Sequence, residues 1–475
     1  MSGGGDMALL IDFGSTYTKL RAVDLDAGAI VAAGQGPSTV GTDVTIGLEA
    51  ALADLGRHMG GVPEFRHRLA SSSAAGGLRM VTVGLVKELT AEAARRAALG
   101  AGARLVGSFS YHLTAGDTAT IVDLAPDVLL LSGGTDGGNS EVILHNAERL
   151  AESPLACPVI AAGNRNATDA IRAMFEAAGK PLVIAGNVMP AFQELDIEPA
   201  RAAIRQVFID RIVHAKGIDR AAEMFDAVLM PTPAAVLAGA RLLAEGVPGR
   251  PGLGPLVALD VGGATTDVHS IAGGEPTGEA VVQHGLPEPY EKRTVEGDLG
   301  MRHNARTIVE TDGAGRIAAA AGVKPDAVEA WLRRIEADTE ILPDRAADRA
   351  IDAAMAGAAV RIAMRRHAGT IRIVHTAAGP VTVQEGKDLT AVAALVGTGG
   401  ALVHAAAPAD ILAAALAGGD EKTSLRPRDP ARYLDEHYVL YAAGLLAEVA
   451  PAAAFALAIN GIRAAGGEDA RRGTG

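Results

Sequence analysis

The chain has very few residues that could cross-link it or anchor it to a surface. Its single cysteine, Cys157, excludes an intrachain disulfide and a cysteine metal cluster. Aromatic residues make up only 3% of the 475 residues, so the core must be aliphatic and closely packed. Apolar runs are broken by a charge or a glycine before about 18 residues, so we expect no membrane-spanning helix. The chain opens on a short Gly-rich segment and not on a signal peptide, which predicts a cytoplasmic protein.

Two further absences narrow the function. Positive charge is in deficit, with a formal net charge of −13, and an acidic surface repels phosphate backbones, so we expect no nucleic-acid partner. No Gly-x-x-x-x-Gly-Lys-Ser/Thr motif occurs, which excludes a P-loop as a nucleotide site. The composition is otherwise globular, and the length suits two or three domains.

What the sequence does contain is a repeat. A strand that ends in Asp-x-Gly and returns as a hairpin occurs at 10–24 and again at 258–272. The predicted strands cover 8–12, 18–24 and 30–34 in the first half, and 256–260, 266–272 and 279–283 in the second half. Such self-similarity predicts a duplicated α/β fold with a cleft between its two halves.

Composition along the chain predicts the boundaries of these halves. A Pro/Gly-rich stretch at 248–255 separates them. Within the first half, after its hairpin, the sequence changes to repeated strand–loop–helix units, which are typical of a parallel α/β insert. The predicted parts are a first half at 1–247, with its core at 8–87 and 228–247 and the insert at 88–227, a second half at 248–465 with a helical subdomain at about 300–370, and a flexible tail at 466–475.

The first hairpin has the composition of a phosphate-binding turn. Gly14 permits a tight turn in which backbone N–H groups approach an anion. Ser15 and Thr16 add hydroxyl donors, and Lys19 can reach a phosphate oxygen. Asp12 would be repelled by phosphate, so its natural role is to hold water on a bound Mg²⁺. Taken alone, an ordinary hairpin with a polar turn explains this motif equally well.

The second hairpin repeats this chemistry with two acids. Asp260 and Asp267 are seven residues apart, and a strand, a turn and a returning strand bring both to one end of a sheet. Two hairpins that face each other would hold a polyphosphate from both sides, so the pair is much more specific than either motif. The residues between the acids are Val261, Gly262, Gly263, Ala264, Thr265 and Thr266.

These hairpins resemble the two phosphate motifs of the actin/Hsp70/sugar-kinase superfamily, whose ATPase fold is α/β, duplicated and ribonuclease-H-like. The runs 230–239 and 442–446 look like its two connecting helices, and 396–400 resembles its adenosine motif. The resemblance implies ATP or ADP with Mg²⁺, slow ATPase activity, catalytic roles for Asp12, Asp260 and Asp267, and Mg²⁺ held through water by Asp12 and Asp260. The implied nucleotide contacts are Gly14, Ser15, Thr16, Lys19, Gly262, Gly263, Thr265, Thr266, Gly397, Thr398, Gly399 and Gly400.

One position departs from the Hsp70 pattern. Where the first connecting motif of Hsp70 proteins has a glutamate near the attacking water, this chain has Met230. Methionine can neither orient water nor accept its proton. Either another acid serves, or hydrolysis is slow and the nucleotide mainly switches the conformation.

Three local strings resemble a narrower family, the GlmL/MutL accessory proteins of glutamate mutase. They are 132–139, 294–300 and 384–390, and the resemblance extends over about residues 8–450. It implies an ATP-binding reactivating chaperone for an adenosylcobalamin-dependent aminomutase. Cobalamin itself is not expected to bind, because the two Asp-x-His sequences, at Asp267 and Asp435, lack the glycine of the cobalt-ligating signature.

Several alternatives stay open at this point. A small-molecule kinase of the same fold would need an acid near the acceptor hydroxyl, which Asp136 or Asp298 could supply, and a filament-forming actin relative would be a structural protein. Thr135 and Asp136 form either a second polar ligand site or a tight turn. Glu296 and Asp298 either touch Mg²⁺ or phosphate, or form a solvated acidic loop.

Overall fold

The computed structural model describes residues 6–14, 17–39, 43–72, 78–214, 226–276, 281–377 and 379–466. The chain forms two compact units. Unit 1 comprises Met1–Gly239, Gly285–Pro287 and Tyr441–Leu457, and unit 2 comprises Ala240–His284, Glu288–Leu440 and Ala458–Gly475. The second unit thus starts near the predicted boundary, but the segment Tyr441–Leu457 belongs to unit 1. The helices that pass between the units in sequence are α8 (Thr232–Glu245), α15 (Val439–Leu446) and α16 (Pro451–Gly461).

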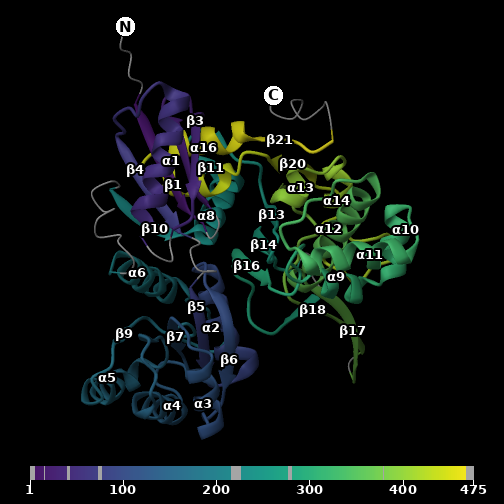
Figure 1. Ribbon diagram of the computed structural model, residues 1–475. Helices are drawn as coiled ribbons and strands as arrows, with labels where there is room; N and C mark the ends of the chain where they lie inside the picture. The colour runs from purple at the N-terminus through teal and green to yellow at the C-terminus, as the bar shows by residue number, and fades with distance from the viewer. Residues whose placement is uncertain are drawn as a thin grey trace. The chain divides into compact units, whose positions relative to one another are not determined.

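The core of unit 1 is a five-stranded sheet in the order β10-β4-β1-β2-β3 (Figure 1). β1 pairs antiparallel with β2, β2 pairs antiparallel with β3, and β4 and β10 continue the sheet in parallel. β1 is buried on both faces, and one face of β1 and β2 packs in the same cluster as α1, whose N-cap Asp43 accepts from Thr45 N. The elements are β1 (Met7–Phe13), β2 (Tyr17–Asp24), β3 (Ala29–Pro37), α1 (Val44–Met59), β4 (His67–Ser72) and β10 (Ala227–Pro231).

The insert of unit 1 is a separate parallel sheet in the order β6-β5-β7-β8-β9. This sheet includes β5, which precedes residue 88, because β5 pairs with β6 and β7 and not with the core sheet. Its strands are β5 (Arg79–Gly84), β6 (Arg104–Ser110), β7 (Val128–Leu131), β8 (Val159–Ala161) and β9 (Leu182–Ile184). Its helices are a π-helical turn (Lys87–Ala91), α2 (Glu92–Gly100), α3 (Ala115–Asp123), α4 (Glu141–Glu152), a 3₁₀ turn (Arg165–Ala167), α5 (Thr168–Ala177) and α6 (Glu198–His214).

Unit 2 repeats the core sheet of unit 1 in the order β16-β14-β13-β19-β20, with β21 added at the edge. The directions also repeat, since β13, β14 and β16 are antiparallel neighbours and β19 and β20 continue in parallel. The strands are β13 (Leu256–Val261), β14 (Thr266–Ile271), β16 (Glu291–Glu296), β19 (Ala394–Thr398), β20 (Ala431–Asp435) and β21 (Ile462–Ala464), and a short ribbon of β11 (Gly246–Val247) and β12 (Arg250–Pro251) precedes them.

The third strand predicted for this half, 279–283, is present from Val281 onward, but it does not belong to the repeated sheet. The third strand of the repeat is β16, and the segment Val281–His284 forms β15 in a separate three-stranded sheet with β18 (Gly379–Glu385) and β17 (Thr370–Thr376). Both segments carry β-branched residues, so local pattern could not tell which one pairs with β14. Residues 279 and 280 of the predicted strand lie outside the described part of the chain.

Between β16 and β17 the chain of unit 2 is helical. Pro325 occupies the first turn of α11, as proline tolerates, and the only tryptophan, Trp331, is fully buried in the core of the unit. No helix among the residues the structure describes is long and apolar enough to cross a membrane. The helices of unit 2 are α9 (Ala305–Asp312), α10 (Ala314–Ala321), α11 (Pro325–Ala337), α12 (Ala346–His367), α13 (Gly400–Val403) and α14 (Pro408–Ala413).

Candidate functional site

Asp12 lies at the end of β1 in unit 1, where a row of polar groups crosses three strands. It is opposite Lys19 on β2 and Ser71 on β4. The Thr232 hydroxyl donates to Asp12 Oδ1 at 2.6 Å, and the Ser71 hydroxyl lies 3.4 Å from the same oxygen. Burial raises the pKa of Asp12, although the Thr232 hydrogen bond and the Lys19 charge act in the opposite direction. A bound cation would therefore favour the ionised form of this carboxyl.

The turn after Asp12 is closed by a hydrogen bond from Gly14 N to Tyr17 O at 3.0 Å. A Cβ at Gly14 would lie 2.6 Å from Tyr17 O, so the turn itself requires glycine. The Ser38 hydroxyl donates to Gly14 O at 2.7 Å and fixes the turn from the side. The predicted hydroxyl donors Ser15 and Thr16 lie outside the described residues.

The second hairpin, in unit 2, has the same geometry. Asp260 at the end of β13 is opposite Asp267 on β14 and Thr398 on β19, and Gly262 N donates to Thr265 O at 2.9 Å. Ser71 and Thr398 thus hold equivalent positions, as do Lys19 and Asp267. The sequence repeat is therefore a repeat in strand register.

The hydroxyl and carboxylate groups of the second hairpin are largely engaged within the protein. Arg293 on β16 donates to Asp267 Oδ1 from Nη2 at 2.6 Å and from Nε at 3.1 Å, and Thr265 Oγ1 donates to Asp267 Oδ2 at 2.9 Å. The buried Thr266 hydroxyl donates to Leu299 O at 2.7 Å. The charge of Asp267 is thus balanced by Arg293. This ion pair favours a role for Asp267 in holding the turn and not a role as a proton acceptor.

A cavity of about 740 Å³ lies within unit 2 beside this hairpin. Gly262 and Gly263 of the hairpin form one wall, and Gly400 of the predicted adenosine motif forms another. The structure thus brings the second hairpin and the predicted adenosine motif together around one cavity. The remaining lining comes from Val261, Met301, Arg302, Leu342, Pro343, Ala346, Arg349, Ala350, Asp352, Ala353, Ala401 and 404–407.

Two glycines of this lining are not required by the fold. A Cβ at Gly263 would meet no atom closer than 3.7 Å, and one at Gly400 none closer than 3.9 Å. Neither has a positive φ. Gly399 differs, with a φ of 92° and Val261 O only 2.4 Å from an added Cβ. Gly399 therefore serves the backbone, whereas Gly263 and Gly400 leave open space on the cavity side.

A buried ion pair supports one wall of the cavity. Arg302 donates to both carboxylate oxygens of Asp352 at 2.9 and 3.0 Å, and Trp331 Nε1 lies 3.3 Å from Asp352 Oδ1. The backbone N–H groups of Met301 and Arg302 donate to Gly262 O and Gly263 O at 3.0 and 2.8 Å. The phosphate-type turn is therefore held to the helical subdomain through its own carbonyls.

The acids Glu296 and Asp298 form neither a metal cluster nor a free acidic loop. Arg366, at the end of α12, donates to Glu296 at 2.6 Å and to the two oxygens of Asp298 at 2.7 and 2.9 Å. The hydrogen bonds from Arg366 lower the pKa of Asp298. Among the described residues no three His, Cys, Asp or Glu side chains form a group that could hold a metal ion.

His269, which the sequence offered only as part of an Asp-x-His sequence without the cobalt-ligating glycine, has a strongly lowered pKa in the structure. It lies two residues after Asp267 on the same face of β14, opposite Arg293, and its side chain is buried. Nδ1 has no hydrogen-bond partner among the described residues. Burial, followed by the charge of Arg293, lowers the pKa of His269 to about 3, so the imidazole is neutral.

The glycine loop of the insert is a turn with an internal polar network. Asp136 Oδ1 accepts from Arg165 N at 3.0 Å and from Asn187 Nδ2 at 2.9 Å. The buried Asn164 accepts from Gly137 N at 3.2 Å and donates to Gly138 O at 3.0 Å. These bonds favour the tight-turn interpretation over a second polar ligand site, because the loop uses its polar groups to join the ends of β7, β8 and β9.

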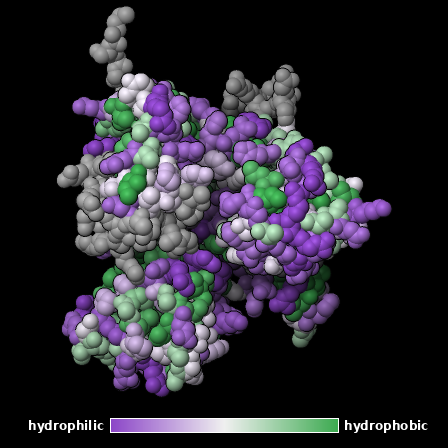
Figure 2. Space-filling model, in the orientation of Figure 1, coloured by the Kyte–Doolittle hydropathy of each residue, from purple (hydrophilic) through white to green (hydrophobic). Residues whose placement is uncertain are grey.

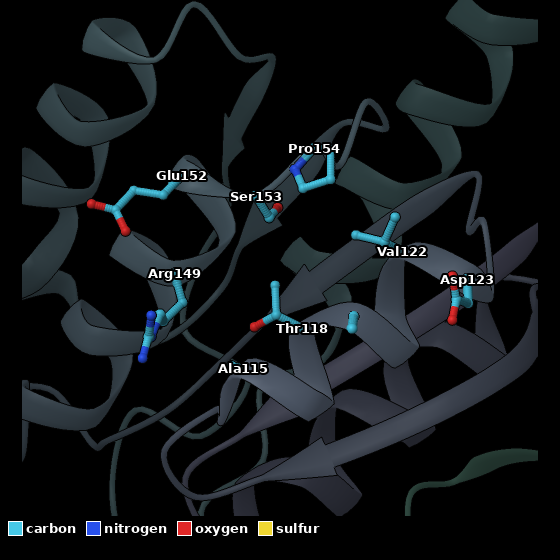
Figure 3. A pocket seen from close by; sticks show the side chains of 9 residues that line it. Ala115, Thr118, Val122, Asp123, Arg149, Glu152, Ser153 and Pro154 are labelled. Carbon is cyan, nitrogen blue, oxygen red and sulfur yellow. The ribbon is translucent and has the colours of Figure 1, made fainter.

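A smaller cavity of about 430 Å³ lies between α3 and α4 of the insert (Figure 3). Figure 3 shows Thr118 and Val122 on the α3 side, Asp123 at one end, and Arg149 with Glu152 on the other side. It contains none of the residues that the sequence singled out, and no glycine lines it.

Three residues that sequence reasoning missed position the acids of the hairpins. Thr232 lies inside the run 230–239, which resembles a connecting helix. Its place in that run was the one sequence signal that could have indicated a contact with Asp12. Ser71 lies on a strand with no motif, and Arg293 directly precedes the string 294–300. Only strand pairing places these two residues beside Asp12 and Asp267.

The strand order of the two units, each with a hairpin at the same place, defines an α/β actin-like ATPase fold, a class of nucleotide-binding proteins. Within this class the chain belongs to the MutL protein family, whose model matches residues 8–462. Protein MutL of Clostridium tetanomorphum is 45% identical over 447 residues, which cover 94% of this chain and 97% of that protein. The family resemblance predicted from the three local strings is confirmed.

Solved structures similar to the chain are more distant. A xylulose kinase from Bifidobacterium adolescentis is 12% identical, with coverage of 94% and 93% and a TM-score of 0.32. An acetate kinase from Porphyromonas gingivalis is 12% identical, with coverage of 93% and 99% and a TM-score of 0.29. The fold assignment above therefore depends on strand order and direction and not on these similarities.

Proposed function

We propose that the chain is a nucleotide-binding accessory protein that reactivates an adenosylcobalamin-dependent mutase of the glutamate mutase type. The observation that carries the nucleotide part is the pair Gly263 and Gly400. Both line the 740 Å³ cavity of unit 2, and neither backbone conformation nor packing requires glycine there. A ligand that must approach the backbone closely is the remaining physical reason for the missing side chains.

Adenine nucleotide is the ligand that suits this lining. The cavity joins an apolar region, with Leu342, Pro343 and Ala346, to the turn that begins at Gly262. The apolar part would cover a base and ribose, and the backbone N–H groups of the turn would hold phosphate. When bound, ATP and ADP would favour different conformations of the chain, because each would bind one conformation more tightly than the other.

Mg²⁺ is part of the proposal. Magnesium usually binds through one or two carboxylates, with water and phosphate oxygens completing its shell, so no cluster of three acids is needed. Asp12 and Asp260 are the candidates, because each lies at the end of its first strand. Asp267 is less suited, since Arg293 already balances its charge.

Hydrolysis is proposed to be slow. Met230 is paired with Ser71, which is paired in turn with Asp12, so these three positions form a row across β10, β4 and β1. The place that would suit a water-orienting acid therefore holds a buried thioether. Slow turnover is compatible with a switch, in which the bound nucleotide and not the rate of its hydrolysis sets the state.

The mutase partner is proposed on the basis of family membership and not of the cavity. The family is associated with glutamate mutase, and the proposed action is the ATP-dependent release of damaged cobalamin from the mutase. Recovery of inactivated mutase by this chain with ATP, and not with ADP or without nucleotide, is the direct test of that role.

Nucleotide binding is tested by calorimetry on Gly263→Ala and Gly400→Ala. Each should weaken Mg-ATP binding by about tenfold, or about 1.4 kcal/mol, with an unchanged melting temperature. Gly315→Ala is the matched control, because that exposed helical glycine also has open space around it and lies outside the cavity. Wild-type affinity in both cavity variants would contradict the assignment of the nucleotide to this cavity.

A further inference from the structure

The insert has a feature that the nucleotide site does not use: exposed aromatic side chains at one edge of its sheet. The strands are parallel, so the loops that follow them all leave from the same edge. Tyr111 follows β6 and is 56% exposed, and Phe192 lies in the loop after β9 and is 70% exposed. In a chain with one Trp, six Tyr and eight Phe, exposed aromatics are scarce. Among the described residues, the exposed Tyr and Phe side chains are Tyr17, Tyr111, Phe192 and Tyr290, so two of the four lie at this edge.

Left-handed backbone occurs at Tyr111 itself and at the residue that follows Phe192. Tyr111 has a φ of 67°, and Gln193, directly after Phe192, has a φ of 62°. Residues with a side chain rarely adopt this left-handed region, and such strain persists only where the surrounding structure enforces it. Strain of this kind gathers at binding sites, so these two positions call for a functional reason.

The structure around Tyr111 does enforce its conformation. Tyr111 N donates to Gly84 O at 3.1 Å, at the end of β5. The fully buried Asn146 of α4 donates to Tyr111 O at 2.9 Å and accepts from Leu113 N at 2.8 Å. A buried amide thus holds the backbone of a residue whose own side chain is exposed.

The loop that carries Phe192 is fixed to the centre of the same edge. Asp136 N donates to Pro190 O at 2.9 Å, and Asp196 N donates to Val188 O at 3.0 Å. Asn187 joins the start of this loop to Gly134 O at 3.0 Å. The glycine loop after β7 therefore serves as a support to which the loop bearing Phe192 is tied.

From these observations we infer that the carboxyl edge of the insert sheet, with Tyr111 and Phe192 as anchors, is a docking surface for a partner protein. A protein fits better than a small polar ligand, because Asp136, Asn164 and Asn187 are committed to bonds within the edge. Rigid exposed aromatics are the residues that dominate protein interfaces, since they bury much area at a low entropic cost.

The partner is a protein surface with apolar recesses for two aromatic side chains, and, resting on the proposed function, it is the mutase. On the face of the insert that Figure 2 draws, hydrophilic and hydrophobic side chains are intermixed. Such a surface is suited to a partner that binds and dissociates, as a reactivating factor requires.

The test uses the full-length chain and a purified glutamate mutase-type enzyme loaded with damaged cobalamin, with binding measured by surface plasmon resonance. Tyr111→Asn removes the ring with a residue that tolerates a positive φ, and Phe192→Ser removes the second anchor. Each should weaken mutase binding at least tenfold, with wild-type nucleotide affinity. Ile373→Ser in unit 2 is the matched control, since Ile373 is an exposed apolar residue too, with an exposed fraction of 67%. This variant should bind the mutase like the wild type.

A second variant separates a binding role from a structural one. Tyr111→Gly relieves the strained φ, so its melting temperature should be no lower than that of the wild type, while mutase binding falls as in Tyr111→Asn. A lower melting temperature with intact binding would mean that Tyr111 serves the fold, and the inference would be overturned.

The remaining outcomes distinguish the inference from the proposed function. If the wild-type chain binds the mutase and both anchor variants bind it equally well, the inference about this surface is overturned and the proposed function stands. No binding of the mutase by the wild-type chain would overturn both. A wild-type dimer that becomes monomeric in the Phe192→Ser variant, by analytical ultracentrifugation, would show that the edge joins two copies of this chain and would also overturn the inference.

Discussion

The two hairpins share strand order, register and turn geometry, but they balance charge in opposite ways. In unit 1 the acid Asp12 is opposite the cation Lys19, whereas in unit 2 the acid Asp260 is opposite a second acid, Asp267. The charge of this second acid is balanced by Arg293, which comes from the neighbouring strand. A duplicated backbone can thus keep its geometry while its two copies acquire different electrostatics, provided that each charge finds a partner.

The largest expected effect tests the role of Arg293 as that partner. Asp267→Asn leaves the buried guanidinium of Arg293 without its carboxylate and should destabilise unit 2 by about 3–5 kcal/mol. Asp12→Asn should change the stability of unit 1 by less than about 1 kcal/mol, because the amide oxygen can still accept from Thr232. Circular dichroism during urea unfolding follows the helices and strands of both units, whereas the fluorescence of Trp331, the only tryptophan, reports on unit 2.

The double variant Asp267→Asn/Arg293→Met is the control, since removing both charges should restore part of the lost stability. Equal destabilisation by Asp267→Asn and Asp12→Asn would mean that the two hairpins do not differ in the proposed way.

His269 gives the next largest contrast, and it depends on pH. At the equivalent place the first hairpin has Arg21, opposite Leu10, whereas His269 is opposite Ala258. The pKa of His269 is about 3 in the fold, against 6.5 for an ordinary histidine, so the unfolded chain binds this proton first. The group therefore costs no stability above pH 6.5 and lowers it progressively as the pH falls from 6.5 toward 3.

His269→Leu should remove this dependence. The free energy of unfolding of the variant minus that of the wild type should be about 3 kcal/mol larger at pH 4 than at pH 7, because only the wild type loses stability through the shifted pKa of His269. Urea unfolding followed by Trp331 fluorescence at the two pH values measures it. Parallel loss of stability in the wild type and the variant between pH 7 and pH 4 would show that His269 is not the responsible group.

The third contrast concerns magnesium. If Asp12 and Asp260 both hold Mg²⁺ through water, Asp12→Asn and Asp260→Asn should each weaken Mg-nucleotide binding by about 1–3 kcal/mol. Binding of nucleotide in EDTA should change little, because the carboxylates then have no cation to hold. A loss confined to one variant would show that only one hairpin carries the metal.

The smallest expected effect is on the rate of hydrolysis. Met230→Glu places an acid in the row that contains Ser71 and Asp12 and should raise ATP hydrolysis by about tenfold. Met230→Gln has a similar shape without the proton acceptor and should leave the rate unchanged. Phosphate release measured under saturating Mg-ATP compares the three proteins, and a fast wild-type rate with no gain in the glutamate variant would place the water near a different acid.

The roles of several residues could be predicted from the sequence because their signals are local. The turn residues Gly14, Gly262 and Gly263 follow a strand directly, and the repeat of Asp-x-Gly at the same spacing predicts the same hairpin twice. The glycines at 397–400 likewise end a strand and start a helix, as the structure has them. The nucleotide and metal roles of these residues stay predictions, since they depend on groups that bind from outside the chain.

Other features were decided only by the tertiary structure, because they depend on which distant strands become neighbours. Thr232 reaches Asp12 across 220 residues, and Arg293 reaches Asp267 only because β16 and not β15 pairs with β14. The same holds for β5, whose apolar residues would suit either sheet of unit 1 and which joins the insert. Local sequence thus determined the turns and the acids of the hairpins, whereas the partners that hold those acids follow from strand pairing, whose energy comes from long-range packing that no short motif records.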